Sequence, residues 1–147
     1  MSKWRIALLT CACLSLAACG DNQSKGFTLP KGDVASGQAV FQARQCTACH
    51  TVKGVAFDLG DVEPEMSLQL GGKMRKVYTY GQLVTSVINP SHKLSKRFPG
   101  KDVDDFGISK MRNYNAVLTV KELTDLVAFL EAHYELEPYQ PTSYGHM

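Results

Sequence analysis

The segment Cys46-Thr47-Ala48-Cys49-His50 limits what this chain can fold into more than any other part of it. Its pattern is C-x-x-C-H, the attachment signature of a c-type haem. Two thiols three positions apart at the end of a helix lie on one face, so Cys46 and Cys49 can form thioethers with the two vinyl groups of one porphyrin. The imidazole of His50 would then lie beneath the iron as its proximal ligand. We therefore expect the chain to fold around one covalently attached haem c.

Three other kinds of site also contain a C-x-x-C pair. A structural zinc site needs four ligands, and the chain has no second Cys pair of this kind. A thioredoxin-like redox pair lies beside a βαβ unit, which this sequence does not predict. A buried disulfide is the simplest alternative. The His directly after the second Cys, together with an export signal upstream, favours haem over all three.

The charge balance gives no support for nucleic-acid binding. The 147 residues, enough for one domain and a leader, include 16 basic and 14 acidic side chains. Two of the basic ones, Lys3 and Arg5, lie in the leader, so the rest of the chain is formally neutral. A nucleic-acid-binding domain is usually strongly basic on one face, and no motif of that class is present.

Residues 1–18 have the organisation of a bacterial signal peptide of the lipoprotein type. A short basic segment ends at Arg5, and the apolar run Ile6–Ala18 follows it. This run is too short for a comfortable membrane span. It leads into Leu16-Ala17-Ala18-Cys19, which resembles the lipobox of bacterial lipoproteins, where cleavage before the Cys leaves a lipidated N-terminus at Cys19. Ordinary secretion with cleavage nearby and an uncleaved short anchor are the alternatives.

Residues 19–33 are expected to be the lipidated N-terminus and a flexible tether, because the segment is polar, with Gly, Asn, Gln and Ser followed by Pro30 and Gly32. A tether of this length has an r.m.s. reach of about 20 Å. Of the five cysteines, Cys11 and Cys13 lie in the leader, Cys19 sits at its end, and Cys46 and Cys49 form the C-x-x-C-H segment. No Cys therefore remains for a structural disulfide. Two or more acyl chains hold a protein stably on a bilayer. We therefore expect an exported protein that its lipid holds at the periplasmic face of a bacterial membrane.

Residues 34–137 are expected to form an all-α haem domain. A first helix is predicted over Ser36–Cys46, with Asp33 or Ser36 at its N-cap. A middle helix is predicted over Gly81–Asn89, where Pro90 ends it. The segments 51–65 and 91–110 are rich in Gly and Pro and are expected to be loops.

The last helix has the clearest signals. Thr119 and Glu122 form a capping box at its start. The helix is predicted to run to about Glu135, with Pro138 ending it and a poorly ordered tail over 138–147. Its expected buried stripe consists of Leu123, Leu126, Val127 and Leu130, flanked by Phe129 and Tyr134.

From Gly37 to Tyr134 the order of these features resembles the monohaem class I cytochrome c family. The further matches are Gly37 with Phe41, Pro64-Glu65-Met66, Ile88-Asn89-Pro90-Ser91, and Met111 ahead of the last helix. The resemblance implies a small cytochrome c fold, in which three to five helices wrap around one haem. It also implies that the Pro64 carbonyl accepts the ring proton of His50.

Met111 is the residue that the resemblance places opposite His50 as the sixth ligand of the iron. A His/Met pair raises the reduction potential relative to a His/His pair. The family commonly has Pro directly after this Met, whereas Arg112 stands here. His92, which follows the middle helix, is the chief alternative and would give a bis-His site. A five-coordinate iron with an open face is a third possibility.

These features predict an electron-transfer protein rather than an enzyme. With both axial positions filled, no small-molecule substrate would bind the iron, and the partners would be redox proteins. Basic residues could form a ring around the haem edge and steer an acidic partner: Lys73, Arg75, Lys76, Lys93, Lys96, Arg97 and Lys101. A haem subunit docked on a larger oxidoreductase complex, and a haem enzyme or gas sensor with an open iron, are the alternative functions.

Overall fold

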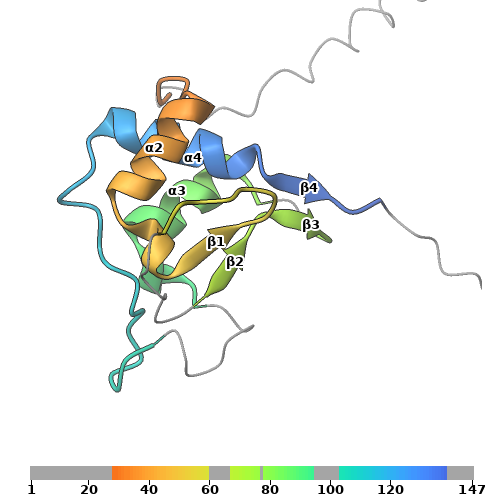
Figure 1. Ribbon diagram of the computed structural model, residues 1–147. Coiled ribbons are helices and arrows are strands. Elements are labelled where there is room, and N and C mark those ends of the chain that lie inside the picture. The colour runs from red at the N-terminus through yellow and green to blue at the C-terminus, as the bar shows by residue number, and fades with distance from the viewer. Residues whose placement is uncertain (1–27, 60–66, 77, 95–102, 139–147) are drawn as a thin grey trace, which may run out of the picture.

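Three α-helices form most of the regular structure in the computed structural model, which describes residues 28–59, 67–76, 78–94 and 103–138. They are α2 (Val34–Ala43), α3 (Tyr80–Ile88) and α4 (Val120–Glu131), with short 3₁₀ turns at η2 (Cys46–Ala48) and η3 (Pro90–His92) (Figure 1). None of the helices in these ranges has the length and apolarity that crossing a membrane requires. The predictions for the signal peptide, Cys19, the Pro64-Glu65-Met66 segment and the tail beyond Pro138 lie outside the described residues.

The first helix begins two residues earlier and ends three residues earlier than predicted. Its start is fixed by Asp33, whose carboxylate accepts a hydrogen bond of 2.7 Å from the backbone N–H of Ser36. The helix ends at Ala43 because Gln45 adopts a left-handed conformation, with φ of 58°. The chain then turns directly into η2, which carries the first Cys of the C-x-x-C-H segment.

The helices α2 and α4 cross at close range because glycines face the backbone of α4. A Cβ atom built on Gly37 would lie 2.0 Å from the carbonyl oxygen of Asp125, and one on Gly32 would lie equally close to that of Thr124. Asp125 is 3% exposed, and its carboxylate accepts hydrogen bonds of 2.9 Å from the Asp33 N–H and 2.8 Å from the Lys121 ammonium. Close packing therefore holds the two helices together along the crossing, and hydrogen bonds to Asp125 add to it at the N-terminal end of α2.

Capping boxes fix the starts of the other two helices. The box of Thr119 and Glu122 is present at the start of α4, as predicted. A second box, formed by Thr79 and Gln82, starts α3 at Tyr80, one residue before the predicted start. The end of α3 at Ile88 leaves Asn89 as its C-cap, directly before Pro90.

Short parallel strand pairs, which the sequence did not predict, complete the described fold. The strand β1 (His50–Val52) pairs with β2 (Leu68–Leu70), and β3 (Gly72–Met74) pairs with β4 (Tyr134–Leu136). The predicted end of the last helix near Glu135 is therefore wrong. The helix ends at Glu131 because the next residues pair with β3, where the Gly72 N–H donates to the His133 carbonyl at 2.8 Å.

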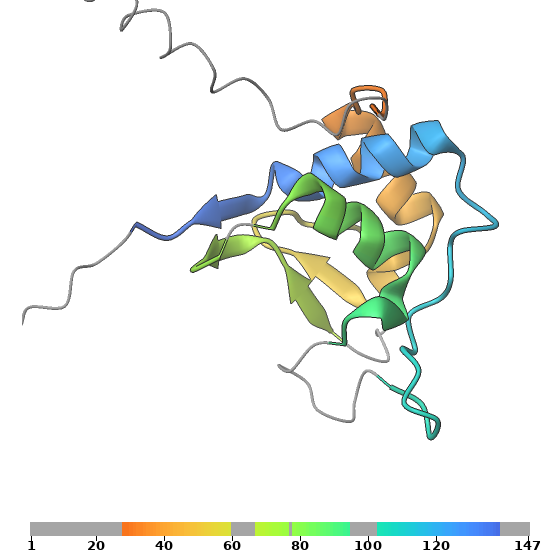
Figure 2. The same cartoon turned by 180° about the vertical axis from the view of Figure 1, so that it is seen from behind.

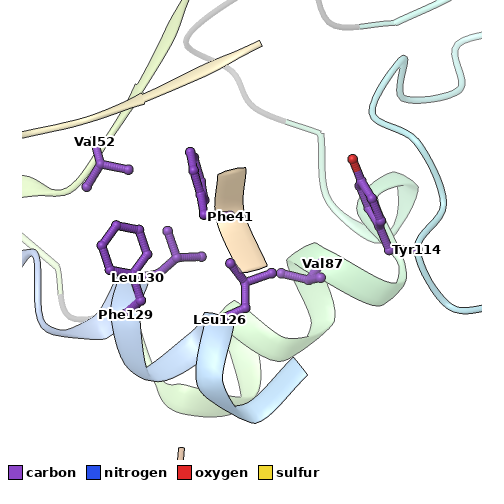
Figure 3. Close-up of a cluster of buried hydrophobic side chains, with 7 residues drawn as sticks. All are labelled: Phe41, Val52, Val87, Tyr114, Leu126, Phe129 and Leu130. Carbon is purple, nitrogen blue, oxygen red and sulfur yellow. The ribbon is translucent and has the colours of Figure 1, made fainter. Parts of the chain in front are cut away.

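The core lies where α2, α3 and α4 meet. Its buried cluster contains Phe41, Val52, Val87, Tyr114, Leu126, Phe129 and Leu130 (Figure 3). The predicted stripe of α4 is confirmed, with Leu126, Val127 and Leu130 buried and Leu123 packed against the cluster. Phe129 was expected at the edge of the stripe but is fully buried, with its ring centroid 5.7 Å from that of Phe41. The mostly helical architecture confirms the predicted fold class.

Candidate haem site

The two thiols of the C-x-x-C-H segment lie on one tight turn. Cys46 opens η2 and Cys49 caps it, and the Cys49 N–H donates to the Cys46 carbonyl at 3.2 Å. Side chains three positions apart in a 3₁₀ turn are aligned along its axis. Both thiols are partly buried and neither is in a disulfide. The structure therefore does not contain the buried disulfide that was the simplest alternative. The turn thus presents two free thiols together at the end of α2.

His50 opens β1, and strand pairing fixes the direction of its ring. The β1–β2 register places His50 opposite Leu68, and the imidazole Nδ1 lies 3.4 Å from the Leu68 carbonyl oxygen. A proton on Nδ1 would therefore be donated to Leu68, which leaves Nε2 as the nitrogen with a lone pair for a metal. Burial lowers the pKa of the His50 imidazole, and the hydrogen bond to Leu68 acts in the opposite direction. Burial thus favours the neutral ring, which is the form that binds metals.

The Leu68 carbonyl is an acceptor that the sequence did not reveal. The predicted acceptor, Pro64, lies outside the described residues. A backbone carbonyl can belong to any residue type, so no side-chain signal marks Leu68 in advance. What could have indicated it is an apolar, alternating segment after the Gly- and Pro-rich loop, with the pattern expected for a short strand.

Tyr114 connects the segment of Met111 to the end of α2, and the sequence did not predict this role. Its phenol donates a hydrogen bond of 2.9 Å to the Arg44 carbonyl at the end of α2. Its side chain is only 8% exposed. Burial raises the pKa of the Cys46 thiol, whereas a hydrogen bond with Tyr114 acts in the opposite direction. An aromatic residue three positions after a candidate ligand, Met111, was the available signal.

Met111 and Cys46 pack against the same core cluster. Both are partly buried hydrophobic neighbours of the cluster that contains Tyr114. The Met111 N–H donates to Ser109 Oγ at 3.2 Å, which holds the backbone of this segment. The chief rival, His92, is exposed on η3. Of these two candidates for the sixth position, Met111 is therefore the one that packs against the core cluster that Cys46 also contacts.

Arg112, which stands where the family commonly has Pro, is turned to a neighbouring ring. Its guanidinium carbon lies 5.7 Å from the centroid of the Tyr114 ring. A cation at this distance from an aromatic face is attracted by the ring. The side chain thereby helps to hold the segment after Met111 against the core.

The basic side chains that were expected to surround a haem edge fall into separate groups. One group lies in or just after β3 and contains Lys73, Arg75 and Lys76, whereas Lys93 follows η3. Figures 1 and 2 place β3 and η3 at different ends of the domain. Arg75 Nε also lies 3.4 Å from the Glu137 carboxylate. Three further members lie outside the described residues: Lys96, Arg97 and Lys101.

The donor set of the site fits a covalently attached haem c. Two free thiols are what the vinyl groups of the porphyrin require, and a neutral imidazole and a thioether are ligands that haem iron takes. Within the described ranges, no group of three or more His, Cys, Asp and Glu side chains could hold a metal ion by itself.

The comparisons with known proteins agree with this donor set. A family model described as Cytochrome c matches residues 34–133, which is more than half of the 147-residue chain. The matched region includes the three described helices, the C-x-x-C-H segment and Met111. No curated protein and no solved structure matches the chain significantly.

Proposed function

Because the chain belongs to the cytochrome c family, we propose that it is a single-electron carrier whose haem c is attached through Cys46 and Cys49. Membership of the family implies a haem protein of electron transfer with one covalent haem c in the domain. When bound, haem c supplies an iron that takes up and releases one electron at a time. In this proposal His50 and Met111 are the axial ligands, and residues 34–137 form the haem domain.

The observation that carries the proposal is the position of His50. It lies directly after two free thiols, and its Nδ1 faces the Leu68 carbonyl at 3.4 Å. A carbonyl in this position holds the ring orientation and increases the basicity of the other nitrogen toward a metal. One short turn and one strand pair thus present both attachment points and an oriented imidazole.

The side chains around this point would keep both axial positions closed. Met111 is partly buried against the same core cluster as Cys46, which supports its role as the sixth ligand. A thioether in that position would exclude water and small molecules from the iron, so the chain would act as a carrier and not as an enzyme. The buried cluster around Phe41 and Phe129 lowers the local dielectric, which is one means of setting a reduction potential.

We also propose that a lipid on Cys19 tethers the domain to the periplasmic face of a bacterial membrane. The support is the basic, apolar and Leu16-Ala17-Ala18-Cys19 succession of the leader. Gly32 and Asp33 already contact α4, so the tether would be the segment between Cys19 and Gly32. A reach of about 20 Å would keep the domain close to the membrane and to membrane-bound redox partners.

An optical spectrum of the purified holoprotein, ferric and ferrous, with and without carbon monoxide, tests the proposal. A weak deep-red band from sulfur bound to ferric iron and no response to carbon monoxide are expected for His/Met ligation. A six-coordinate spectrum without this band would replace Met111 by His92. Ready binding of carbon monoxide would show an open iron and would replace the carrier by an enzyme or gas sensor.

A further inference from the structure

A small hairpin over residues 103–109 extends away from the helices in the segment before Met111 (Figures 1 and 2). Val103 and Ser109 form an antiparallel bridge at its base. The Asp104 N–H donates to the Ile108 carbonyl at 2.8 Å, and the Gly107 N–H donates back to the Asp104 carbonyl at 3.0 Å. Gly107 has a φ of 75°, a conformation that this residue type adopts without strain. The hairpin is therefore a defined turn.

One side chain braces the tip of this hairpin from within. The Asp104 carboxylate oxygen Oδ1 accepts hydrogen bonds of 2.9 Å from the backbone N–H groups of Phe106 and Ile108. At the base, the Ser109 N–H donates to Ser91 Oγ of η3 at 3.2 Å. The backbone that carries Phe106 is thus fixed before any partner arrives, which reduces the backbone entropy that binding would cost.

Phe106 is the most exposed large apolar side chain in the described residues, at 88%, and Ile108 beside it is 53% exposed. Aromatic side chains on a preorganised backbone are the usual anchors of protein interfaces. We propose that the 103–109 hairpin is the docking element for a redox-partner protein, with Phe106 inserted into an apolar depression that has a positively charged edge.

The charges around Phe106 favour this occupant over a lipid surface. Asp104 and Asp105 directly precede Phe106 at the tip and are exposed. A bacterial or other anionic membrane surface repels carboxylates, whereas a basic group beside the depression of a protein partner would attract them. Lys110 and Arg112, at the base of the hairpin, are also exposed. The surface therefore carries negative charge at the tip and positive charge at the base, and this pattern would select the partner.

The hairpin is also connected to the proposed axial ligand. Ser109 accepts a hydrogen bond from the Met111 N–H, so a partner seated on the hairpin would lie next to the Met111 segment. This inference rests on the proposed carrier function. In each encounter one electron would pass between this chain and a one-electron centre of the partner protein, so that one is oxidised as the other is reduced.

The test is electron exchange between the full-length holoprotein and membranes of its source cells from which the chain has been deleted. The rate is followed in the visible absorption of the haem at increasing concentrations of the holoprotein. Phe106→Ser is expected to raise the KM at least about tenfold, the loss typical of a truncated interface anchor, with kcat nearly unchanged. Leu136→Ser is the matched control, because Leu136 is 60% exposed and belongs to β4, a strand that lies far from the hairpin in both views.

Oxidation by ferricyanide and the reduction potential separate docking from damage to the haem site. Both are expected to be the same in Phe106→Ser and in the wild type. A shifted potential would mean that Phe106 covers the haem, and an unchanged KM would mean that the partner docks elsewhere. Either result overturns the docking hairpin while the carrier function stands. Absence of saturable exchange by the wild type would overturn the carrier function and the hairpin with it.

A tryptophan reporter tests the lipid alternative. Phe106→Trp is mixed with vesicles of phosphatidylglycerol and phosphatidylcholine, and the wild type gives the background, because its single Trp, Trp4, lies in the leader that processing would remove. No blue shift of the additional emission is expected. A blue shift would show that the tip enters the lipid interface and would overturn the protein partner.

Discussion

Replacing Gly37 by Ala tests whether the close crossing of α2 and α4 holds the domain together. The added Cβ would lie 2.0 Å from the Asp125 carbonyl oxygen and 2.6 Å from the Phe129 Cβ, whereas ordinary contact begins at 3.4 Å. Both neighbours belong to α4, and the nearer one is backbone, so no side-chain rotation relieves the clash. The two helices would have to separate by roughly 1 Å, in an interior that is packed as densely as a crystal.

The expected loss follows from two opposing terms. Overpacking of a core usually costs about 1–3 kcal/mol, and a clash with backbone belongs at the upper end of that range. Against this, Ala is favoured over Gly in a helix by about 1 kcal/mol. The free energy of unfolding should therefore fall by about 2 kcal/mol. With a urea m-value of roughly 1–2 kcal/mol/M for a domain of this size, the midpoint should fall by about 1–2 M.

The assay is urea unfolding of the holoprotein, followed by circular dichroism, with Gly81→Ala as the matched control. Gly81 is a helical residue of α3, and a Cβ there would meet nothing within 4 Å. The same substitution should therefore stabilise the protein by up to about 1 kcal/mol. If both variants raised the midpoint, helix propensity and not the crossing would govern Gly37, and the reasoning would be refuted.

Three further substitutions test the site, the anchor and the crossing. Met111→Ala should leave the haem attached, open the iron to carbon monoxide and lower the potential by on the order of 100 mV. The control Met74→Ala, in β3, should change neither the response to carbon monoxide nor the potential. An unchanged spectrum and potential in Met111→Ala would remove Met111 as a ligand. Cys19→Ala should move the protein from the membrane fraction to the soluble periplasm, and continued membrane binding would indicate a partner or an uncleaved leader. Hydrogen bonds from Lys121 and from the Asp33 N–H lower the pKa of Asp125, so its stabilising effect is present above the unfolded value of about 4 and is lost as the pH falls through the lowered folded value. Urea midpoints between pH 7 and pH 2 should accordingly fall less steeply for Asp125→Asn than for the wild type, and equal slopes would assign the acid sensitivity to other groups.

The helices could be predicted because their signals are local. The Thr119 and Glu122 capping box, the apolar stripe of α4 and the stop at Pro90 each depend on residues within a few positions of one another. The box of Thr79 and Gln82 is equally local, and it starts α3 one residue before the predicted Gly81. The C-x-x-C-H segment is equally local, and its chemistry depends on spacing alone.

The strands and their contributions to the site could not be predicted in this way. The pairing of β3 with β4 joins segments about 60 residues apart, and short strands have almost no periodicity of their own. For the same reason the predicted last helix runs into residues that form β4. The role of the Leu68 carbonyl depends on the register of β1 and β2, a property of the folded chain that no single residue type marks.

The packing of the helices and the geometry of the candidate site meet at one residue, Arg44. Its guanidinium pairs with Glu122 of the α4 capping box, while its backbone carbonyl accepts the hydrogen bond from Tyr114. Cys46 follows two positions later. Because α2 is held against α4 by Gly37 and by this ion pair, the end of α2 is fixed, and with it the start of the turn that carries both thiols. The segment that carries Met111 is tied to the same point through Tyr114. A separation of the two helices should therefore disturb the site as well as the stability, so the potential of Gly37→Ala should shift although the substitution lies outside the C-x-x-C-H segment.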